Sequence, residues 1–216
     1  MLPTRLRPAL LATLALGSIA CMQRPTEPQP PLGESAPSTA PALEMPLPRG
    51  GANVIGELAT PLEAVQAVGE VTAWRGAAPA TLVRWWTDTC PFCARSLPAI
   101  EAMRADYGER GLQTLAVYHP KPPRPVDEGA VRAAAERLGY SGPLAVDRDW
   151  SVLRELYLDR NRSSPTSVSF LLDDEGRVRF VHPGPQFFPS EDPRFSQESE
   201  DEQDLRRAIE VLLAEG

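Results

Sequence analysis

Two cysteines separated by two residues, Cys90 and Cys93, limit the fold of this 216-residue chain more than any other feature. The run before them, residues 82–86, is β-prone, and residues 97–107 after them carry apolar side chains at helical spacing. The pair is therefore predicted at a junction between a strand and a helix. Two thiols this close in sequence can close a disulfide within one helical turn.

The expected helix start distinguishes the two thiols. Cys90 lies at the N-terminus, where the helix dipole and free backbone N–H groups stabilise a thiolate, and Cys93 lies one turn further in and should be more buried. We therefore expect Cys90 to attack a disulfide and Cys93 to resolve the mixed disulfide that forms. This chemistry needs no cofactor.

Three other interpretations of the pair are weaker. A structural disulfide that closes only two intervening residues removes little chain entropy. A zinc site needs two further ligands, and the two histidines, His119 and His182, show no ligand spacing. A soft metal such as copper could bind to the two sulfurs alone, so a copper-binding chaperone stays an alternative.

The apolar pattern of the remaining sequence predicts an α/β domain. Alternating strands and helices indicate a sheet with helices on both faces, and a terminal hairpin makes that sheet mixed. The other expected elements are strands at 115–118 and 144–146, helices at 127–138 and 149–158, a hairpin at 168–181 and a final helix at 205–213.

The first twenty residues resemble an export signal. Two arginines precede an apolar run over residues 9–20, which is too short to span a bilayer comfortably as a helix. We predict a signal peptide at 1–20. Cys21 directly follows small residues and resembles the lipid-attachment cysteine of bacterial lipoproteins, so we expect a lipid anchor there. Ordinary cleavage near residue 20 is the alternative.

Prolines separate this signal from the folded part. Eight of the 24 prolines lie between residues 22 and 51, in a segment that cannot bury enough apolar surface to offset its chain entropy. We predict a disordered Pro-rich linker at 21–57 and one folded domain at 58–216. The formal net charge of −7 gives no long-range attraction to phosphate, so nucleic acid is not an expected partner.

Several motifs within residues 58–216 together resemble the thioredoxin superfamily. They are the strand ending in Trp85-Trp86, the Cys-Pro-Phe-Cys turn, Pro98 five residues after the second cysteine, Ser164-Pro165-Thr166 before a strand, and the Asp-Glu-Gly hairpin turn. Within that superfamily, an exported, tethered domain with a helix inserted before the Pro-Thr strand is similar to the TlpA-like thiol–disulfide oxidoreductases. The resemblance implies a thioredoxin-like fold.

The resemblance also implies a surface that clients contact. It makes Pro165 a cis-proline whose loop, with Thr166, faces the cysteines and docks the extended backbone of a client. Trp86 corresponds to an aromatic residue beneath the active site, with a plain core tryptophan as the alternative. Pro91 and Phe92 of the turn complete the expected client-binding residues.

The chain departs from the thioredoxin pattern beside the cysteines. Thr89 stands where many thioredoxins have tryptophan. Arg84 stands where they carry a buried acid that moves a proton to and from the second thiol, and an arginine cannot be that base. Its side chain could point inward or lie on the other side of the strand. Asp88 or Glu101 could substitute as the proton carrier, and His119 is expected on a surface loop.

Together these features predict an exported, lipid-anchored thiol–disulfide oxidoreductase on the periplasmic side of a bacterial envelope. Its partners would be client proteins with thiols or disulfides and a membrane electron donor. Because Pro91 and Phe92 add no charge beside Cys90, we expect a reductant, with a potential nearer thioredoxin's ~−270 mV than a strong oxidant's ~−120 mV. A thioredoxin-fold peroxidase related to the peroxiredoxins is a second alternative.

Overall fold

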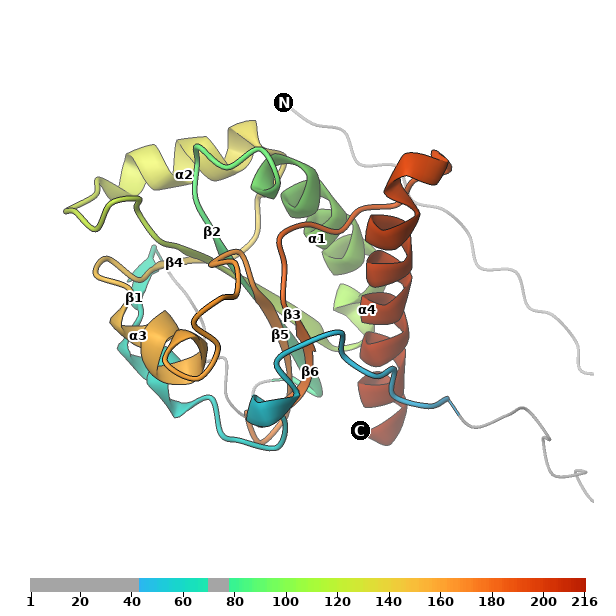
Figure 1. Cartoon of the computed structure of the whole chain (residues 1–216). Coiled ribbons are helices and arrows are strands. Elements are labelled where there is room, and N and C mark those ends of the chain that lie inside the picture. The colour runs from blue at the N-terminus through green and yellow to red at the C-terminus, as the bar shows by residue number, and fades with distance from the viewer. Residues whose placement is uncertain (1–42, 70–77) are drawn as a thin grey trace, which may run out of the picture. The chain divides into compact units, whose positions relative to one another are not determined.

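The computed structural model describes residues 43–69 and 78–216 (Figure 1). The predicted signal peptide, Cys21 and the first part of the linker lie outside the described residues. None of the helices within the two described ranges has both the length and the apolarity that crossing a membrane requires.

Among the described residues, contacts with the sheet and the core already occur before residue 58, the predicted start of the domain. Val54 is fully buried, and the Gly56 N–H donates to the Val178 carbonyl over 2.7 Å. The end of the predicted linker is therefore part of the folded unit. The sequence does not predict this attachment, because the segment forms no long helix or strand and therefore has no apolar periodicity. Single buried side chains and backbone hydrogen bonds hold it.

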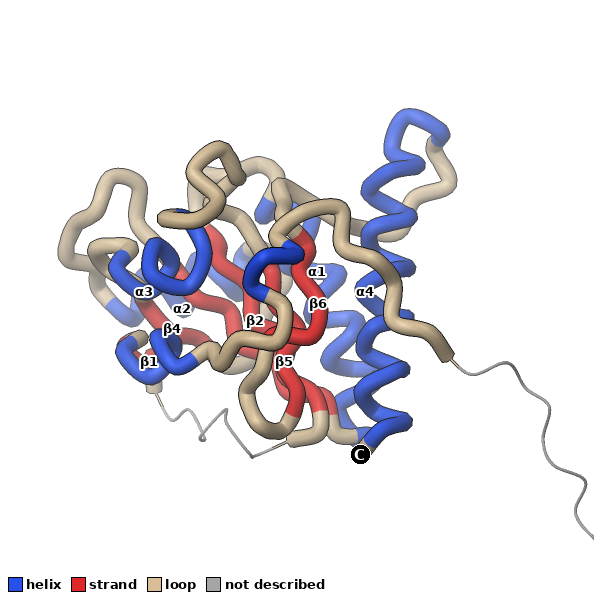
Figure 2. The backbone as a smooth tube through the Cα atoms, turned by 60° about the horizontal axis from the view of Figure 1, so that its bottom comes forward, coloured by secondary structure: helices blue, strands red, loops and turns tan. Residues whose placement is uncertain are grey.

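The described residues contain one mixed sheet of six strands, in the order β1-β4-β3-β2-β5-β6 (Figure 2). Their bounds are β1 (Gln66–Val68), β2 (Ala80–Trp86), β3 (Leu112–Tyr118), β4 (Leu144–Val146), β5 (Ser169–Asp173) and β6 (Val178–His182). β2, β3 and β4 are parallel, whereas β1, β5 and β6 each run antiparallel to their neighbours. The mixed sheet is as predicted, and only the three-residue β1 is new.

Helices cover both faces of this sheet, as the sequence predicted. Their bounds are α1 (Cys93–Tyr107), α2 (Glu128–Arg137), α3 (Ser151–Leu153), which continues as a π-helical turn (Arg154–Leu158), and α4 (Ser196–Glu215). Short 3₁₀ turns lie at Ala52–Val54, Thr60–Ala64, Gly108–Arg110 and Pro193–Phe195. Figure 1 shows α3 and α4 on opposite sides of the sheet.

Alternation along β2 divides the core into two layers. Leu82 and Trp86 pack in the layer with α1, α2 and α4, and Val83 and Trp85 pack in the layer with α3. All seven residues of β2 are buried, because a strand at the centre of a sheet covered on both faces has no solvent side. The last residues of β2 therefore lead the chain out of the core directly to the cysteine pair.

Replacing Phe170 by Ala is expected to lower the free energy of unfolding by about 3–5 kcal/mol, because it leaves a cavity in the core. The Phe170 ring is fully buried, with centroids 5.6 Å from Trp85 and 5.5 Å from Tyr157. Urea denaturation measures the change. Phe92→Ala is the control, because Phe92 is 42% exposed and should cost about 1 kcal/mol or less. Equal losses in both variants would contradict this core.

Candidate active site

The cysteine pair lies where β2 meets α1. β2 ends at Trp86 and α1 begins at Cys93, so Cys90 precedes the helix instead of lying in its first turn. Cys93 is fully buried, Cys90 is partly exposed, and both are free thiols. The Cys93 N–H donates to the Cys90 carbonyl over 3.1 Å and closes the turn between them. The predicted difference in burial is present, although the helix starts later than expected.

Hydrogen bonding separates the acidities of the two thiols. The Cys93 thiol donates to the Cys90 sulfur, and this bond contributes most to lowering the pKa of Cys90 to about 5. Burial opposes that shift, while the Ser167 hydroxyl and backbone N–H groups of the turn add to it. The same sulfur–sulfur bond, with burial, raises the pKa of Cys93. At neutral pH Cys90 is therefore a thiolate and Cys93 a thiol.

Ser167 faces both sulfurs, and it was not among the site residues predicted from the sequence. Its hydroxyl oxygen lies 3.3 Å from Cys93 Sγ and 3.9 Å from Cys90 Sγ. The residue is buried in the loop before β5. Its only sequence signal is its place two residues before that strand, where the chain passes the end of β2.

The prediction for Pro165 is wrong in one respect. The Ser164–Pro165 peptide is trans, and the cis bonds of the described residues are Lys121–Pro122 and Gly184–Pro185. Pro165 lies four residues before β5 and lines the groove near Cys90, whereas the side chain that contacts both sulfurs, as the cis-proline was expected to do, is that of Ser167. The trans form is also the one that most X-Pro bonds adopt.

The loop that carries Ser167 is held by close backbone packing. Gly184 has φ of 91°, and a Cβ atom on it would lie 2.4 Å from the Ser167 carbonyl oxygen. Only glycine fits this contact, since the conformation is strained for other residues and the space is already filled. The segment after β6 therefore fixes the loop that faces the thiols.

A groove of about 420 Å³ opens over Cys90. Its lining includes four of the predicted client-binding residues, Pro91, Phe92, Pro165 and Thr166. The other lining residues are Thr87, Thr89, Lys121, Ser167 and Pro185. The groove thus offers a partly exposed sulfur at the side of a mostly apolar surface with one lysine, which suits an extended peptide segment around a client cysteine.

Trp86 does not line this groove. Its side chain is fully buried, and its ring meets the Tyr118 ring edge to face at a centroid distance of 5.0 Å. Trp86 therefore lies in the core beneath the site and has no exposed surface that a client could contact in this conformation.

His119 is buried, contrary to the prediction of a surface loop. Its Nε2 atom lies 2.8 Å from the Thr166 hydroxyl, and the Trp150 ring covers it edge to face at 5.4 Å. Burial, helped by the charge of Lys121, lowers the pKa of His119 to about 3, so the ring is neutral at physiological pH. Through its hydrogen bond, the neutral imidazole holds the side chain of Thr166, which lines the groove.

Arg84 points inward, toward α1. The side chain is fully buried, and its guanidinium donates to the Ser169 hydroxyl over 3.1 Å, the Ser96 hydroxyl over 3.3 Å and the Pro185 carbonyl over 2.7 Å. Burial lowers its pKa, while the sulfur of Cys93 raises it. A guanidinium keeps its proton in proteins, so this is a fixed positive charge beside the thiols.

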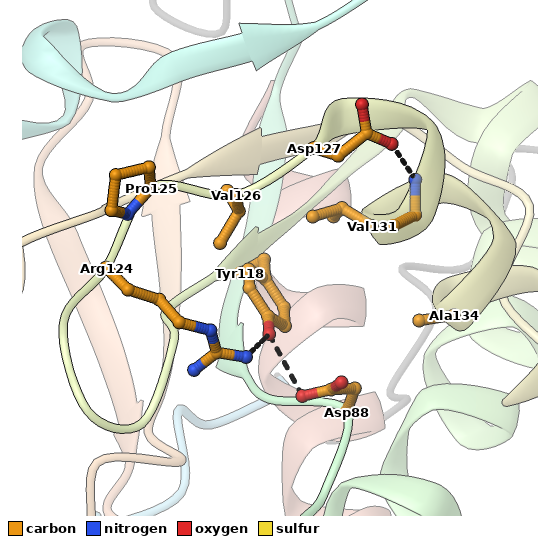
Figure 3. A pocket seen from close by; sticks show the side chains of 9 residues that line it. Asp88, Tyr118, Arg124, Pro125, Val126, Asp127, Val131 and Ala134 are labelled. Carbon is orange, nitrogen blue, oxygen red and sulfur yellow. Dashed lines mark hydrogen bonds between the residues drawn. The ribbon is translucent and has the colours of Figure 1, made fainter.

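Neither predicted proton carrier contacts a sulfur. Glu101 lies further along α1 and binds Arg104 on the same helix and Ser141 in the loop after α2. Asp88 accepts a hydrogen bond from Tyr118 over 2.9 Å and lines a separate pocket with Arg124, as Figure 3 shows. The structure therefore leaves the proton of Cys93 without a neighbouring carboxylate in the part of the chain that is described.

Comparisons with curated proteins relate this chain to thiol–disulfide enzymes. A family model described as Redoxin matches residues 38–194. The thiol-disulfide oxidoreductase ResA of Halalkalibacterium halodurans is 28% identical over 102 residues, which cover 47% of this chain and 52% of ResA. Protein DipZ of Mycobacterium bovis is 29% identical over 100 residues, covering 46% of this chain and 14% of DipZ. The chain spans about half the length of ResA and less of DipZ.

Two solved structures are similar in fold. A hypothetical protein from Sinorhizobium meliloti 1021 has a TM-score of 0.55 at 22% identity, covering 74% of this chain and 85% of that chain. A putative protein disulfide isomerase from Bacteroides thetaiotaomicron has a TM-score of 0.52 at 17% identity, covering 70% of this chain and 86% of that chain. At these identities the likeness concerns the fold alone.

Titration of the reduced protein should show one thiol ionising with a midpoint near pH 5, because the pKa of Cys90 is lowered to about 5 and that of Cys93 is raised. The thiolate is present above that midpoint and disappears as the pH falls through it. Thiolate absorbance measures it on the full chain carrying Cys21→Ser. Ser167→Ala should raise the midpoint, because one donor to the sulfur is lost.

Ser141→Ala is the control for this titration, since its hydroxyl bonds Glu101 and no sulfur. It should leave the midpoint unchanged. A parent midpoint near the ordinary thiol value of about 8.5 would contradict the assignment of Cys90 as the thiolate.

Proposed function

The chain belongs to the Redoxin family, and from this premise we propose that it is an exported thiol–disulfide oxidoreductase that exchanges its Cys90–Cys93 dithiol or disulfide with envelope proteins. Its fold is thioredoxin-like and the TlpA-like resemblance holds, as the sequence predicted. One observation carries the proposal. A partly exposed Cys90 with a lowered pKa is backed by a buried Cys93 that hydrogen-bonds it.

Two steps follow from this pair. The Cys90 thiolate attacks one sulfur of a client disulfide, forms a mixed disulfide and releases the other client sulfur as a thiolate, which takes up a proton. Cys93 then loses its proton and attacks Cys90, so that the client leaves reduced and the protein is left with a Cys90–Cys93 disulfide. Two electrons have moved from protein to client, and a dithiol donor must return them.

The groove supports proteins as clients. It is open beside Cys90, and its lining of Pro91, Phe92, Pro165 and Thr166 gives apolar surface and backbone for an extended segment. Lys121 is the charged residue of the lining, so selection among clients would rest mainly on shape and apolar contact.

The proposed direction is reduction of clients. The Cys-Pro-Phe-Cys turn itself carries no charged side chain. Arg84 adds a cation from β2, which stabilises a thiolate and raises the potential above what the turn alone would give. We therefore propose a mild reductant of labile disulfides, which have higher potentials than structural ones.

The proposed location is the periplasmic side of a bacterial envelope. It rests on the sequence prediction of a signal peptide at 1–20, with lipid attachment at Cys21, and of a Pro-rich linker that follows. An exported domain needs an electron donor that delivers reducing equivalents through the membrane, so a membrane dithiol protein is the proposed partner.

The Cys93→Ser variant should accumulate mixed disulfides with clients, because Cys90 can still attack but nothing resolves the adduct. Non-reducing electrophoresis of envelope proteins, followed by identification of the captured chains, measures this. Cys90→Ser is the matched control and should capture none.

An empty Cys93→Ser trap would contradict exchange with proteins. If copper then co-purifies with the wild type, the two sulfurs serve as a metal carrier. Within the described residues no group of three or more His, Cys, Asp or Glu side chains is placed to hold a metal ion, so such a carrier would depend on the sulfurs alone. Peroxide consumption by the purified chain would instead support the peroxidase alternative.

Equilibration with glutathione should give a reduction potential for the pair nearer about −270 mV than about −120 mV. The measurement is made on the full chain with Cys21→Ser, so that one dithiol remains. A potential nearer about −120 mV would reverse the proposed direction and leave exchange itself intact.

A further inference from the structure

The buried charge of Arg84 has no carboxylate partner among the described residues. Its hydrogen bonds go to two serine hydroxyls and to the Pro185 carbonyl, its Nε atom is buried without a partner, and the Phe187 ring lies 5.3 Å from the guanidinium carbon. A buried cation is costly unless an anion or aligned dipoles compensate it. Neutral acceptors do this only in part, so the site favours any anion that forms beside the guanidinium.

The sulfur of Cys93 is where such an anion can form. Arg84 acts on Cys93 more strongly than on Cys90, and it is the one charge that favours the Cys93 thiolate. In the free reduced protein this effect is masked, because Cys93 gives its hydrogen bond to the Cys90 thiolate. Once Cys90 is bonded to a client sulfur, it carries no negative charge and the masking interaction is gone.

We propose that Arg84 and Ser167 together replace a carboxylate base in the resolving step, with Arg84 stabilising the Cys93 thiolate and Ser167 passing its proton outward. This inference rests on the proposed function, because resolution presupposes a mixed disulfide. Arg84 acts through Cys93 and is a positioning residue. Ser167 contacts both reacting sulfurs and is a catalytic residue.

The step balances without another reactant. The Cys93 thiol gives its proton to the Ser167 oxygen, 3.3 Å away, as the Ser167 hydroxyl releases its own proton toward the groove. The Cys93 thiolate attacks Cys90 Sγ, the Cys90–client bond breaks, and the departing client thiolate takes up the released proton. Ser167 ends as it began, and Ser167 lines both the Cys93 side and the groove side of the pair.

Among the residues that the structure describes, no other titratable group is placed to take the proton of Cys93. His119 and His182 are both buried and held neutral by lowered pKa values, and the charge of Arg84 contributes to each shift. Lys121 lines the groove, and its side chain is basic and therefore supplies no anionic base. On α1, Ser96 presents a hydroxyl to Arg84 and no charge.

The first test isolates Cys93 in the full chain carrying Cys21→Ser and Cys90→Ser, where it is the one thiol left. Arg84→Met removes the charge but keeps an apolar stem, and it should raise the pKa of Cys93 by about one unit or more, a tenfold loss of thiolate at pH below that pKa. Arg84→Lys should restore most of the thiolate. Absorbance of the thiolate against pH measures each.

Arg95→Met is the matched control, because Arg95 is an exposed cation on the same helix as Cys93. It should leave the pKa of Cys93 unchanged. A Cys93 pKa that is the same in Arg84→Met and in the parent would overturn the role of Arg84, provided that circular dichroism shows both folded. If Arg84→Met does not fold, the Arg84→Lys and Ser167 variants carry the test.

The second test follows release of glutathione from Cys90 in a single turnover, with Cys93 present. Arg84→Met should slow release about threefold per unit of raised pKa, because a more basic thiolate is also more nucleophilic and offsets part of the tenfold loss. The deficit should shrink as the pH rises toward the pKa of Cys93. A loss of equal size at every pH would mean a structural defect and would overturn the proposal.

Ser167→Ala should slow the same release at neutral pH, and Ser167→Thr should restore it, because threonine keeps the hydroxyl. An unchanged rate in Ser167→Ala would overturn the proton path. These rates are measured with glutathione and without any envelope protein. The expected rate changes can therefore be observed even if the Cys93→Ser variant captures no client. The failure of this inference and the failure of the proposed function are therefore separate results.

Discussion

The hydrogen bond from the buried Cys93 thiol to the Cys90 sulfur is the interaction on which the site depends. It lowers the pKa of one cysteine and raises that of the other, so two chemically equal residues acquire different roles. The bond exists because the chain reaches the surface at the end of β2 and re-enters the core at the start of α1. One sulfur remains at the edge of the groove while the other enters the core.

Segments far apart in sequence hold this pair in place. The loop before β5 brings Ser167 to both sulfurs, and the segment after β6 packs its Gly184 backbone against that loop. Arg84 on β2 bonds β5, α1 and the segment after β6 at once. A buried cation thus serves as a structural junction and sets the electrostatics of the thiols. Substitution of Arg84 consequently changes packing as well as charge, which is why charge-preserving variants are needed to interpret it.

The fold was largely predictable because its signals are local. Period-two and helical apolar spacing gave the strands from β2 to β6 and the helices α1 to α3 within a few residues. The last helix was predicted at 205–213, but α4 begins nine residues earlier, at Ser196, because the first turns of α4 are acidic and carry no apolar pattern. The three-residue β1 and the attachment of residues 43–57 were not predicted. Both segments are too short to show a periodic apolar pattern, and a few individual contacts hold them. Backbone hydrogen bonds of Gly56 and Glu57 with Val178 attach the end of the predicted linker to β6, and no local sequence pattern predicts these bonds.

The sequence by itself singled out the cysteine pair that we propose as nucleophile and resolving thiol, because the spacing of Cys90 and Cys93 between a strand and a helix leaves little choice of geometry. Only the tertiary structure decided what surrounds them. It placed Ser167 where Pro165 was expected, turned Arg84 inward and buried His119 against Thr166. Each of these depends on which residues from distant strands meet at one end of the sheet. These tertiary contacts are determined by strand order and packing, and the local spacing of residues does not encode them.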